Sequence, residues 1–301
     1  MADQVDLTVP ASLDGERVDK ALAELLDLSR AHAALVIGEG VEIDGVPAKR
    51  SDRVRVGQVI HCTPPESQPG LVAEEVGFGV LYEDDDVIVV DKPARVVVHP
   101  GSGRTSGTLA AGLLHRYPEL EGVGAEERWG LVHRLDKDTS GAVLVARNQA
   151  AHDQLAAALR RREVERTYTA LVEGRMGAPT GTVDAPVGRD PSQPTRRAVI
   201  HGGKPARTHY EVVRYFEDSD VSLLDVSLET GRTHQIRVHL AAIGHPVVGD
   251  RTYGATRADP TVPRTFLHAA RLRFSHPRTG ESLEVEAPLP PDLRSVLERL
   301  S

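Results

Sequence analysis

Short runs of apolar residues, bounded by turn residues, recur along the second half of the chain. The run AVLVA at 142–146 is rich in β-branched residues and lies between charged and polar segments, which predicts a buried strand. Comparable patterns predict strands at 86–91, 164–173 and 221–229. Apolar residues at helical spacing, together with start and stop signals, predict helices at 109–116, 149–162, 233–243 and 292–300. The helices are too few for a regular β–α–β series, so the pattern predicts an α+β fold with a mixed, mainly antiparallel sheet.

The first part of the chain has its own pattern. Apolar residues at helical spacing predict a helix at 16–26, and a second helix at 30–37 has Ser29 as its candidate N-cap. The alternating segment 41–45 ends in Asp-Gly, which predicts a hairpin, and 57–60 closes the unit. Residues 62–70 are rich in proline and polar residues, as a linker would be.

These patterns predict four segments. Residues 1–14 form an N-terminal extension, 15–62 a small helix-and-hairpin domain, 63–75 a linker, and 76–301 a larger α+β domain. A chain of 301 residues is long enough to bury either one large core or two smaller ones.

Charge is distributed unevenly along the chain. The net charge is −8, and residues 1–75 account for most of it, with 7 Lys and Arg against 14 Asp and Glu. Residues 188–207 instead carry Arg189, Arg196, Arg197, Lys204 and Arg207 against the single acid Asp190. Their glycines and prolines predict a flexible arm, and its net charge of +4 suits the grip of an RNA backbone. A solvated loop without a ligand is the alternative.

Composition narrows the class of protein further. The single cysteine, Cys62, excludes an internal disulfide and a cysteine-rich zinc site. No apolar run approaches the roughly 20 residues of a membrane span. The N-terminus lacks the basic and apolar regions of a signal peptide, so we expect a cytoplasmic protein.

Three patterns suggest a metal or nucleotide site, but each lacks a feature that such a site requires. The acidic run 83–86 has no second cluster of ligands in the sequence, which favours a solvated turn over a metal site. The glycine-rich segment 101–108 lacks the lysine of a phosphate loop, and Thr108 more plausibly begins a helix. His234 and His239 lie about 140° apart around a helix, too far to share an ion. We therefore expect neither a metal nor a cofactor.

The densest cluster of charge is the loop before the buried strand, at 131–141. Charged side chains on a loop held by a buried strand are well placed for catalysis, although a solvated turn would have the same spacing. The loop sequence HRLDKDTSG resembles the HRLD-x-x-TSG signature of the RluA/RluD group of RNA pseudouridine synthases, with every fixed position present. That resemblance implies that Asp136 is the catalytic nucleophile.

Other segments resemble the same family. RTYTALVEG at 166–174 resembles the strand that carries the active-site tyrosine, which implies Tyr168. TGRTHQIRVH followed by GHPVVGD resembles the segment whose arginine pairs with the catalytic aspartate, which implies Arg237. The C-terminal segment FLHAARLRFSHPRTG also resembles the family, and by analogy this implies that Leu267 packs on the face of the uracil. In KPARVVVHP, Arg95 stands where the family usually has glycine.

Residues 15–62 resemble the S4 domain, a small RNA-binding module, through the pattern RVDKAL, LSRA, IGEGVEIDG and VGQVI. Family members present basic residues on the second helix, which implies RNA binding by Arg30. The segment is acidic overall, so a protein-contact or vestigial role is the alternative.

The resemblance implies a monomeric enzyme that isomerises uridine to pseudouridine in RNA, with 23S (large-subunit) rRNA as its expected substrate. Arg237 would keep Asp136 ionised, and Tyr168 would stack on the base and relay a proton. Arg134 would fill the space that the flipped uridine leaves, unless it forms an internal salt bridge with Asp138.

Two rival functions remain on sequence grounds. A non-catalytic RNA-binding or ribosome-assembly factor could combine an S4 domain with an inert synthase fold, but it need not retain Asp136, Tyr168 and Arg237 together. A glycosidase could use Asp136 and Asp138 as its acid pair. Carboxylates two residues apart and an aromatic content of 4% make that rival weak.

Overall fold

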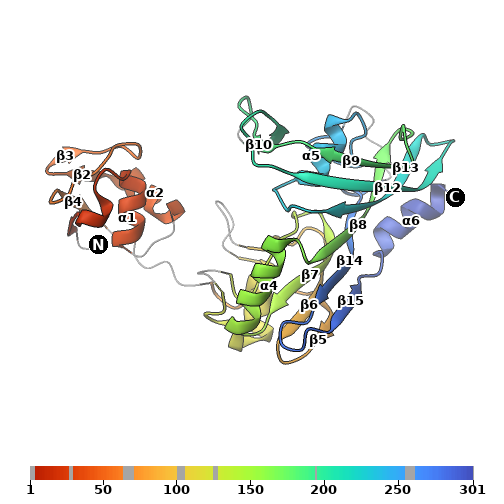
Figure 1. The fold of residues 1–301 in the computed structure, drawn as a ribbon, viewed down its shortest axis with the longest axis horizontal. Helices are drawn as coiled ribbons and strands as arrows, with labels where there is room; N and C mark the ends of the chain where they lie inside the picture. Colours follow the sequence, from red (N-terminus) through yellow and green to blue (C-terminus); the bar gives the residue numbers. More distant parts are fainter. Residues whose placement is uncertain are drawn as a thin grey trace. The chain divides into compact units, whose positions relative to one another are not determined.

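The computed structural model describes residues 4–26, 30–63, 71–99, 106–124, 128–193, 195–254 and 262–300. The chain separates into two compact units, residues 1–70 and 71–301 (Figure 1). The division falls inside the predicted linker 63–75, most of which lies outside the described residues, as does the predicted cap Ser29. No helix in the described ranges combines the length and the apolarity needed to cross a bilayer.

Two helices and a four-stranded antiparallel sheet build the first unit. The helices are α1 (Val18–Leu25) and α2 (Arg30–Glu39). The strands lie in the order β1 (Val5–Thr8), β4 (Val59–Cys62), β2 (Val41–Ile43) and β3 (Val46–Pro47). Asp44 and Gly45 both have positive φ, as the tight turn of the predicted hairpin requires.

The prediction that residues 1–14 form an extension outside the first domain is wrong for residues 5–13, which belong to its sheet and core. Strand β1 pairs with β4 from Val5 opposite Cys62 to Thr8 opposite Val59. Val9 and Leu13, the latter in the short 3₁₀ helix η1 (Ala11–Leu13), are buried in the core of the unit. The alternation in VDLT is too short to identify a strand without its partner, which lies more than fifty residues away in the sequence.

A nine-stranded sheet dominates the second unit. Its path runs from one edge to the other through β5 (Gly79–Glu83), β6 (Val87–Lys92), β7 (Ser140–Ala146), β14 (Leu267–Ser275), β8 (Glu165–Glu173), β13 (Val221–Leu228), β12 (Arg207–Phe216) and β9 (Thr180–Asp184). Strand β15 (Ser282–Glu286) also pairs with β14. Only the β7–β14 pairing is parallel among these described strands. The α+β prediction with a mixed, mainly antiparallel sheet is therefore confirmed.

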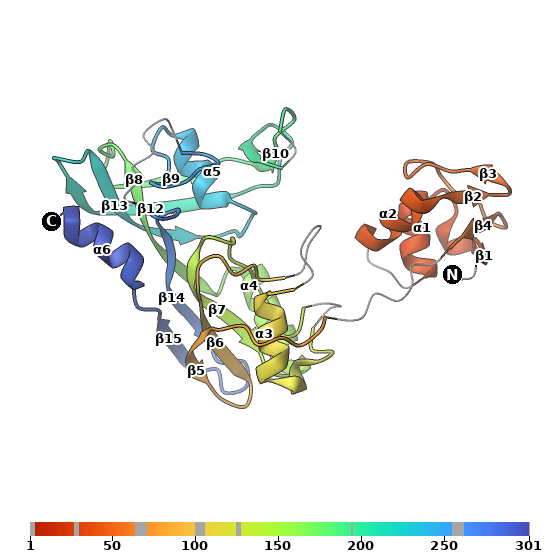
Figure 2. The same cartoon turned by 180° about the vertical axis from the view of Figure 1, so that it is seen from behind.

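Helices cover both faces of the β5–β6–β7 half of this sheet. Ile88 and Val90 share a hydrophobic core with Leu109 of α3 (Leu109–Arg116), whereas Val87 and Val89 pack with Leu155 of α4 (Gln149–Arg161). Alternate residues of one strand point to opposite faces, so α3 and α4 lie on opposite sides, as Figures 1 and 2 show. The helix α6 (Pro291–Leu300) joins the α3 side, and the 3₁₀ helix η2 (Pro118–Leu120) follows α3.

The predicted flexible arm at 188–207 is instead partly folded. The strands β10 (Val187–Arg189) and β11 (Arg197–Val199) form a two-stranded antiparallel sheet. Val187 and Ala206 pack against Val238 of α5 (Gln235–Ala242), which anchors this β10–β11 hairpin. Gly188 lies within β10 and Gly202 lies in a turn, so a glycine-rich composition did not exclude strands here. The short strands depend on tertiary packing.

Candidate active site

The loop between Leu131 and Ser140 is held at several backbone positions. The Leu144 amide of β7 donates to Nε2 of His133 at 2.9 Å, and the Thr139 amide donates to the Asp136 carbonyl at 3.2 Å. The Arg95 amide donates to the Lys137 carbonyl at 2.7 Å. The buried strand predicted from sequence thus anchors the loop that carries Asp136.

Lys92, at the end of β6, is a fully buried support of the same loop. Its ammonium group donates to the carbonyls of Pro93 and Val96 at 2.8 Å and of Lys137 at 3.3 Å. Burial, with a contribution from the Arg264 charge, lowers the pKa of Lys92 to about 7. Three carbonyl acceptors on one lysine tie the 93–96 turn to the loop of Asp136.

Arg264 is a second buried support. Its guanidinium donates to the Asp138 carbonyl at 3.0 Å and to Ser140 Oγ at 2.9 Å. The same group pairs with the Asp292 carboxylate on α6 at 2.7 Å. Arg264 therefore connects the far side of the loop to the C-terminal helix.

Asp136 and Arg237 meet although 101 residues separate them in the sequence. Arg237 Nη1 donates to Asp136 Oδ2 at 3.0 Å from the buried face of α5. The rest of the guanidinium is occupied by Asp250, through Nε to Oδ2 at 2.6 Å and Nη2 to Oδ1 at 2.9 Å. A bidentate pair of this kind fixes the plane of the guanidinium, and so fixes the direction of its third bond.

Asp250 was part of a matched motif, but sequence reasoning assigned it no role. Its carboxylate also accepts hydrogen bonds from the Thr252 and Tyr253 amides. Burial alone would raise the pKa of Asp250, but the bonds and charge of Arg237 lower it below its ordinary value. The site thus includes a carboxylate that stays ionised and orients Arg237.

Asp136 opens into a pocket of about 710 Å³, which Tyr168 and Leu267 also line. Tyr168 projects from β8 and Leu267 begins β14, so the two adjacent strands supply an apolar surface beside the carboxylate. Burial raises the pKa of the Tyr168 phenol, which is therefore neutral at pH 7. The structure brings together Asp136, Tyr168, Arg237 and Leu267, four of the residues that the resemblance implies.

His234 is a further neighbour of Asp136 that sequence reasoning considered only as a metal ligand. The Tyr253 hydroxyl accepts from the Arg197 amide at 2.8 Å and so donates to His234 Nδ1, also at 2.8 Å. The proton of the neutral ring is then on Nε2, which lies 3.9 Å from Asp136 Oδ2. Burial lowers the pKa of His234, which favours this neutral form.

Tyr253 connects the β10–β11 hairpin to the same site. Two guanidinium groups lie over its ring, with Arg196 Cζ at 5.1 Å and Arg237 Cζ at 5.0 Å from the ring centroid. Two residues proposed for RNA contact, Arg196 and Arg197, therefore touch the tyrosine that touches His234 and Arg237. No motif in the sequence places Tyr253 there, because the contact joins distant segments.

Arg134 and Arg30 occupy different parts of the molecule. Arg134 is exposed and lines the pocket, and the described residues contain no ion pair between it and Asp138. Arg30 begins α2 in the first unit, and its side chain lies outside the described part of the structure.

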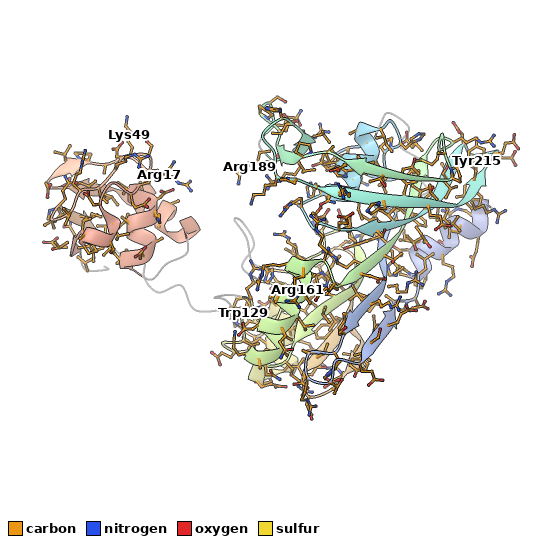
Figure 3. All side chains as sticks on the ribbon, in the orientation of Figure 1. Arg17, Lys49, Trp129, Arg161, Arg189 and Tyr215 are labelled. Carbon is orange, nitrogen blue, oxygen red and sulfur yellow. The ribbon has the colours of Figure 1, made fainter. Side chains whose placement is uncertain are left out.

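The pocket lining is strongly basic, in contrast to the acidic chain. The described lining residues include seven arginines and two acids, Asp136 and Glu229; the arginines are Arg128, Arg134, Arg160, Arg162, Arg166, Arg232 and Arg237. Figure 3 marks Arg161 at the end of α4, whose neighbours Arg160 and Arg162 reach the pocket. A positive concave surface attracts a polyanion.

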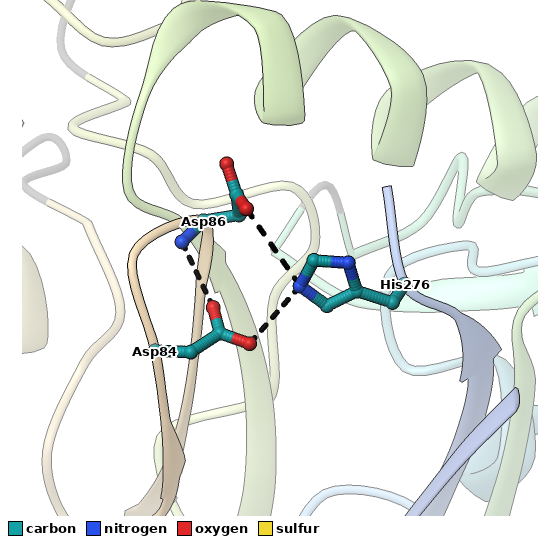
Figure 4. A group of neighbouring side chains, drawn as sticks. All are labelled: Asp84, Asp86 and His276. Atoms are coloured by element: carbon teal, nitrogen blue, oxygen red, sulfur yellow. Dashed lines mark hydrogen bonds and ion pairs between the residues drawn. The ribbon is translucent and has the colours of Figure 1, made fainter. Parts of the chain in front are cut away.

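The acidic run at 83–86 acquires a distant partner in the fold. His276 approaches Asp84 at 3.0 Å and Asp86 at 3.8 Å, so that one ligand atom of each lies within 4.8 Å of the others (Figure 4). The carboxylates are already engaged, since Asp84 accepts from Tyr82 and two amides and Asp86 accepts from Asn148 and Arg278. His276 Nδ1 accepts from two further amides. The cluster therefore joins two turns by hydrogen bonds within the protein.

Comparisons with known proteins agree with this geometry. A family model described as RNA pseudouridylate synthase matches residues 86–242. The ribosomal large subunit pseudouridine synthase D of Nitrosomonas europaea is 45% identical over 98% of this chain and 88% of its own length. An uncharacterized RNA pseudouridine synthase of Chloroflexus aurantiacus is 48% identical over 99% of this chain and 94% of its own.

Among solved structures, Human RNA Pseudouridylate Synthase Domain Containing 1 is similar, with a TM-score of 0.58 and 31% identity. The match covers 77% of this chain and 97% of the human chain. The matched family segment contains Asp136, Tyr168 and Arg237 but ends before Asp250.

Proposed function

The chain belongs to the RNA pseudouridylate synthase family, and we propose that it converts uridine to pseudouridine in large-subunit ribosomal RNA with Asp136 as the catalytic carboxylate. Membership makes it an isomerase that acts on RNA. One observation carries the assignment of the site: the Asp136 carboxylate lies in a basic pocket, 3.0 Å from an arginine that a second carboxylate holds in place.

The reaction requires little from outside the protein. The N1–C1′ bond of uridine breaks, the uracil turns, a C5–C1′ bond forms, N1 gains a proton, and the proton on C5 leaves. No electron or group is exchanged with another reagent. One carboxylate suffices, either to attack the substrate or to remove a sugar proton, and Asp136 fills that role.

Arg237 and Asp250 prepare this carboxylate. The charged hydrogen bond from Arg237 holds the Asp136 carboxylate in one orientation in the pocket. Asp250 holds two nitrogens of Arg237, so the third can point only toward Asp136. The neutral ring of His234 places its Nε2–H near the same carboxylate oxygen, with Nε2 3.9 Å from Asp136 Oδ2.

Tyr168 and Leu267 form the contact surface for the base. Both line the pocket from neighbouring strands, and an aromatic ring beside an aliphatic side chain suits a planar uracil. The neutral phenol of Tyr168 can also relay a proton during the rearrangement.

The target uridine must leave its stack to reach Asp136, at a cost of a few kcal/mol. Arg134 is exposed at the pocket and is free of an ion pair within the described residues, so its planar guanidinium can fill the vacated space. The β10–β11 hairpin, with Arg196 and Arg197 beside Tyr253, supports an accompanying grip on the RNA backbone.

The substrate, the location and the first unit complete the proposal. The name of the Nitrosomonas europaea relative supports large-subunit ribosomal RNA as the substrate. We propose 23S rRNA as that RNA, and a monomeric, cytoplasmic enzyme without a resident cofactor. Residues 15–62 would act as an S4-like RNA-binding domain, in which Arg30 begins the second helix.

The test is tritium release from large-subunit rRNA labelled with [5-³H]uridine, because only loss of the C5 hydrogen frees the label. The wild type should release tritium without an added cofactor. Asp136→Asn keeps the shape of the side chain and an acceptor for Arg237, yet should lower the rate by at least about three orders of magnitude.

Asp138→Asn is the matched control, since Asp138 is exposed on the same loop and contributes a backbone carbonyl to Arg264. It should retain the wild-type rate. Wild-type activity in Asp136→Asn would contradict the assignment of the catalytic residue. Absence of release by the wild type, with rRNA binding intact, would favour the non-catalytic binding factor.

A further inference from the structure

Arg166 is a buried cation without a carboxylate partner among the described residues. This residue of β8 is 7% exposed as a whole, much like Arg237 at 8% and Arg264 at 6%. Those two arginines are clamped by Asp250 and Asp292 respectively. Arg166 has only a long hydrogen bond from Nη2 to the Leu228 carbonyl at 3.4 Å, and its buried Nε has no partner in the described structure. A buried guanidinium in this state is costly unless a ligand compensates its charge.

The neighbouring turn leaves room beside Arg166. A Cβ on Gly231 would lie 2.9 Å from Arg166 Nη1, so a side chain there would displace the guanidinium. Both Arg166 and Gly231 line the pocket that contains Asp136. The unpartnered cation therefore borders the space in which the substrate reacts.

His133 adds a second unused donor to this pocket. Its Nε2 accepts from the Leu144 amide, so the proton of the neutral ring is on Nδ1. The Nδ1 atom is buried and has no hydrogen-bond partner among the described residues. Burial, and then the charge of Arg166, lower the pKa of His133 to about 3, so the ring is neutral under ordinary conditions.

Arg166 lies on the same strand, β8, as Tyr168, the residue proposed to contact the base. Arg166 and Tyr168 are two positions apart in the strand, so their side chains point to the same face, and both are buried at the pocket. The rise along a strand separates their Cα atoms by about 7 Å. A base beside Tyr168 and a sugar at Asp136 leave the phosphate of the same nucleotide within reach of Arg166. A neutral uracil carbonyl could accept a hydrogen bond there but would not neutralise the buried charge.

We propose that Arg166, assisted by His133, forms a subsite for a phosphate of the target nucleotide itself. The inference rests on the proposed function, because it takes the flipped uridine to occupy the pocket. The subsite would hold the nucleotide by its phosphate while the uracil detaches and turns, so that C1′ stays beside Asp136. Arg166 is thus a binding residue for the substrate, distinct from the exposed arginines that contact RNA from outside the pocket.

Arg166→Met tests the proposal, because methionine fills the buried space without charge. The melting temperature of the free protein should stay level or rise, since a desolvated and unpaired charge is removed. Arg264→Met is the matched control: its cation is equally buried but paired, so its removal should lower the melting temperature. A lower melting temperature in Arg166→Met would show a structural role and overturn the proposal.

Ligand binding supplies the second readout, with uridine 3′-monophosphate, uridine 5′-monophosphate and uridine as probes. At least one monophosphate should bind the wild type more tightly than uridine does, and Arg166→Met should abolish that advantage while leaving uridine binding unchanged. Gly231→Ala, which displaces the guanidinium and keeps its charge, should reduce the same advantage and covers the case in which Arg166→Met does not fold. Equal loss of uridine and monophosphate binding would instead assign Arg166 to the base.

Catalysis on rRNA supplies the third readout. Arg166→Met should raise KM by at least about tenfold and reduce by about 1 the slope of log affinity against log salt, as expected for loss of one phosphate contact. An unchanged KM would contradict the proposal. The binding assays do not depend on turnover, so phosphate recognition through Arg166 without tritium release would retain the subsite and remove the proposed function.

Discussion

Arg95 lies in a backbone conformation that disfavours a side chain. Its φ is +70°, in the left-handed region that favours glycine, and the resemblance of KPARVVVHP to the family implies glycine at this position. The turn is nevertheless formed, because the Arg95 amide donates to the Lys137 carbonyl and Lys92 binds the carbonyls on either side. Tertiary contacts thus hold a residue in a conformation that costs roughly 1–2 kcal/mol.

Arg95→Gly should therefore stabilise the second unit by about 1 kcal/mol, since relief of the strain exceeds the greater entropy of glycine in the unfolded chain. Urea unfolding followed by the fluorescence of Trp129 measures this effect in the second unit alone, because Trp129 is the single tryptophan (Figure 3). Arg95→Ala is the control: it removes the side chain but retains a Cβ, and should give no stabilisation. A gain of equal size in Arg95→Ala would refute the backbone explanation.

At the scale of elements, one ion pair determines how α5 meets the segment after it. Arg237 on α5 and Asp250 in the following turn form a bidentate pair, and the turn also donates two amides to Asp250. Asp136, the proposed catalytic carboxylate, contacts this assembly at a single nitrogen of Arg237. The geometry of Asp136 therefore depends on the packing of two elements and not only on its own loop.

Asp250→Asn should destabilise the second unit by about 3 kcal/mol at pH 7, because it leaves Arg237 with a buried charge and one remaining carboxylate. The rate of tritium release should also fall, since Arg237 is no longer held in plane. The folded pKa of Asp250 is below 3.8, so its stabilisation is fully present above pH 3.8 and is lost as the pH falls through the lower value.

Acid titration of both proteins isolates this contribution. The wild type and Asp250→Asn should differ in unfolding free energy at neutral pH and converge as the pH falls below about 3.8. Other carboxylates with lowered pKa values, such as Asp84 and Asp292, are present in both and cancel. A difference that stays constant with pH would show that the charge of Asp250 contributes nothing.

At the scale of the molecule, the two units have separate hydrophobic cores. One core lies entirely within residues 5–62, and the others lie within 71–300. The described residues of the pocket all come from the second unit. The first 70 residues carry 7 basic and 12 acidic side chains, a net charge of −5, so the basic pocket belongs to a different unit from most of the negative charge.

Residues 71–301 should therefore fold without the first unit and retain kcat on a short uridine-containing RNA. Loss of an RNA-binding domain should raise KM for full-length rRNA and leave KM for the short RNA unchanged. Tritium release from the two substrates, by the full chain and by the truncated chain, measures both values. Equal KM values on rRNA would favour the protein-contact or vestigial role for residues 15–62.

Local patterns in the sequence were enough to predict part of the secondary structure and the main chemical groups. Period-two and helical patterns located β6, β7, β8, β13 and the helices of the second unit, because these patterns follow from local backbone geometry and burial. Contiguous motifs singled out Asp136, Tyr168 and Arg237, since each motif lies within one short segment.

Which groups are paired became evident from the three-dimensional structure. The bonds of Arg237 to Asp136 and Asp250 join residues that are distant in sequence, as do the contacts of Tyr253 with two arginines. The same holds for Arg166, which has no carboxylate partner among the described residues. The chemical type of a residue limits the hydrogen bonds and ion pairs that it can form. Which of them it forms depends on burial and on which distant segments pack beside it. For that reason the motif RTYTALVEG alone does not show that Arg166 is a buried cation at the pocket that contains Asp136.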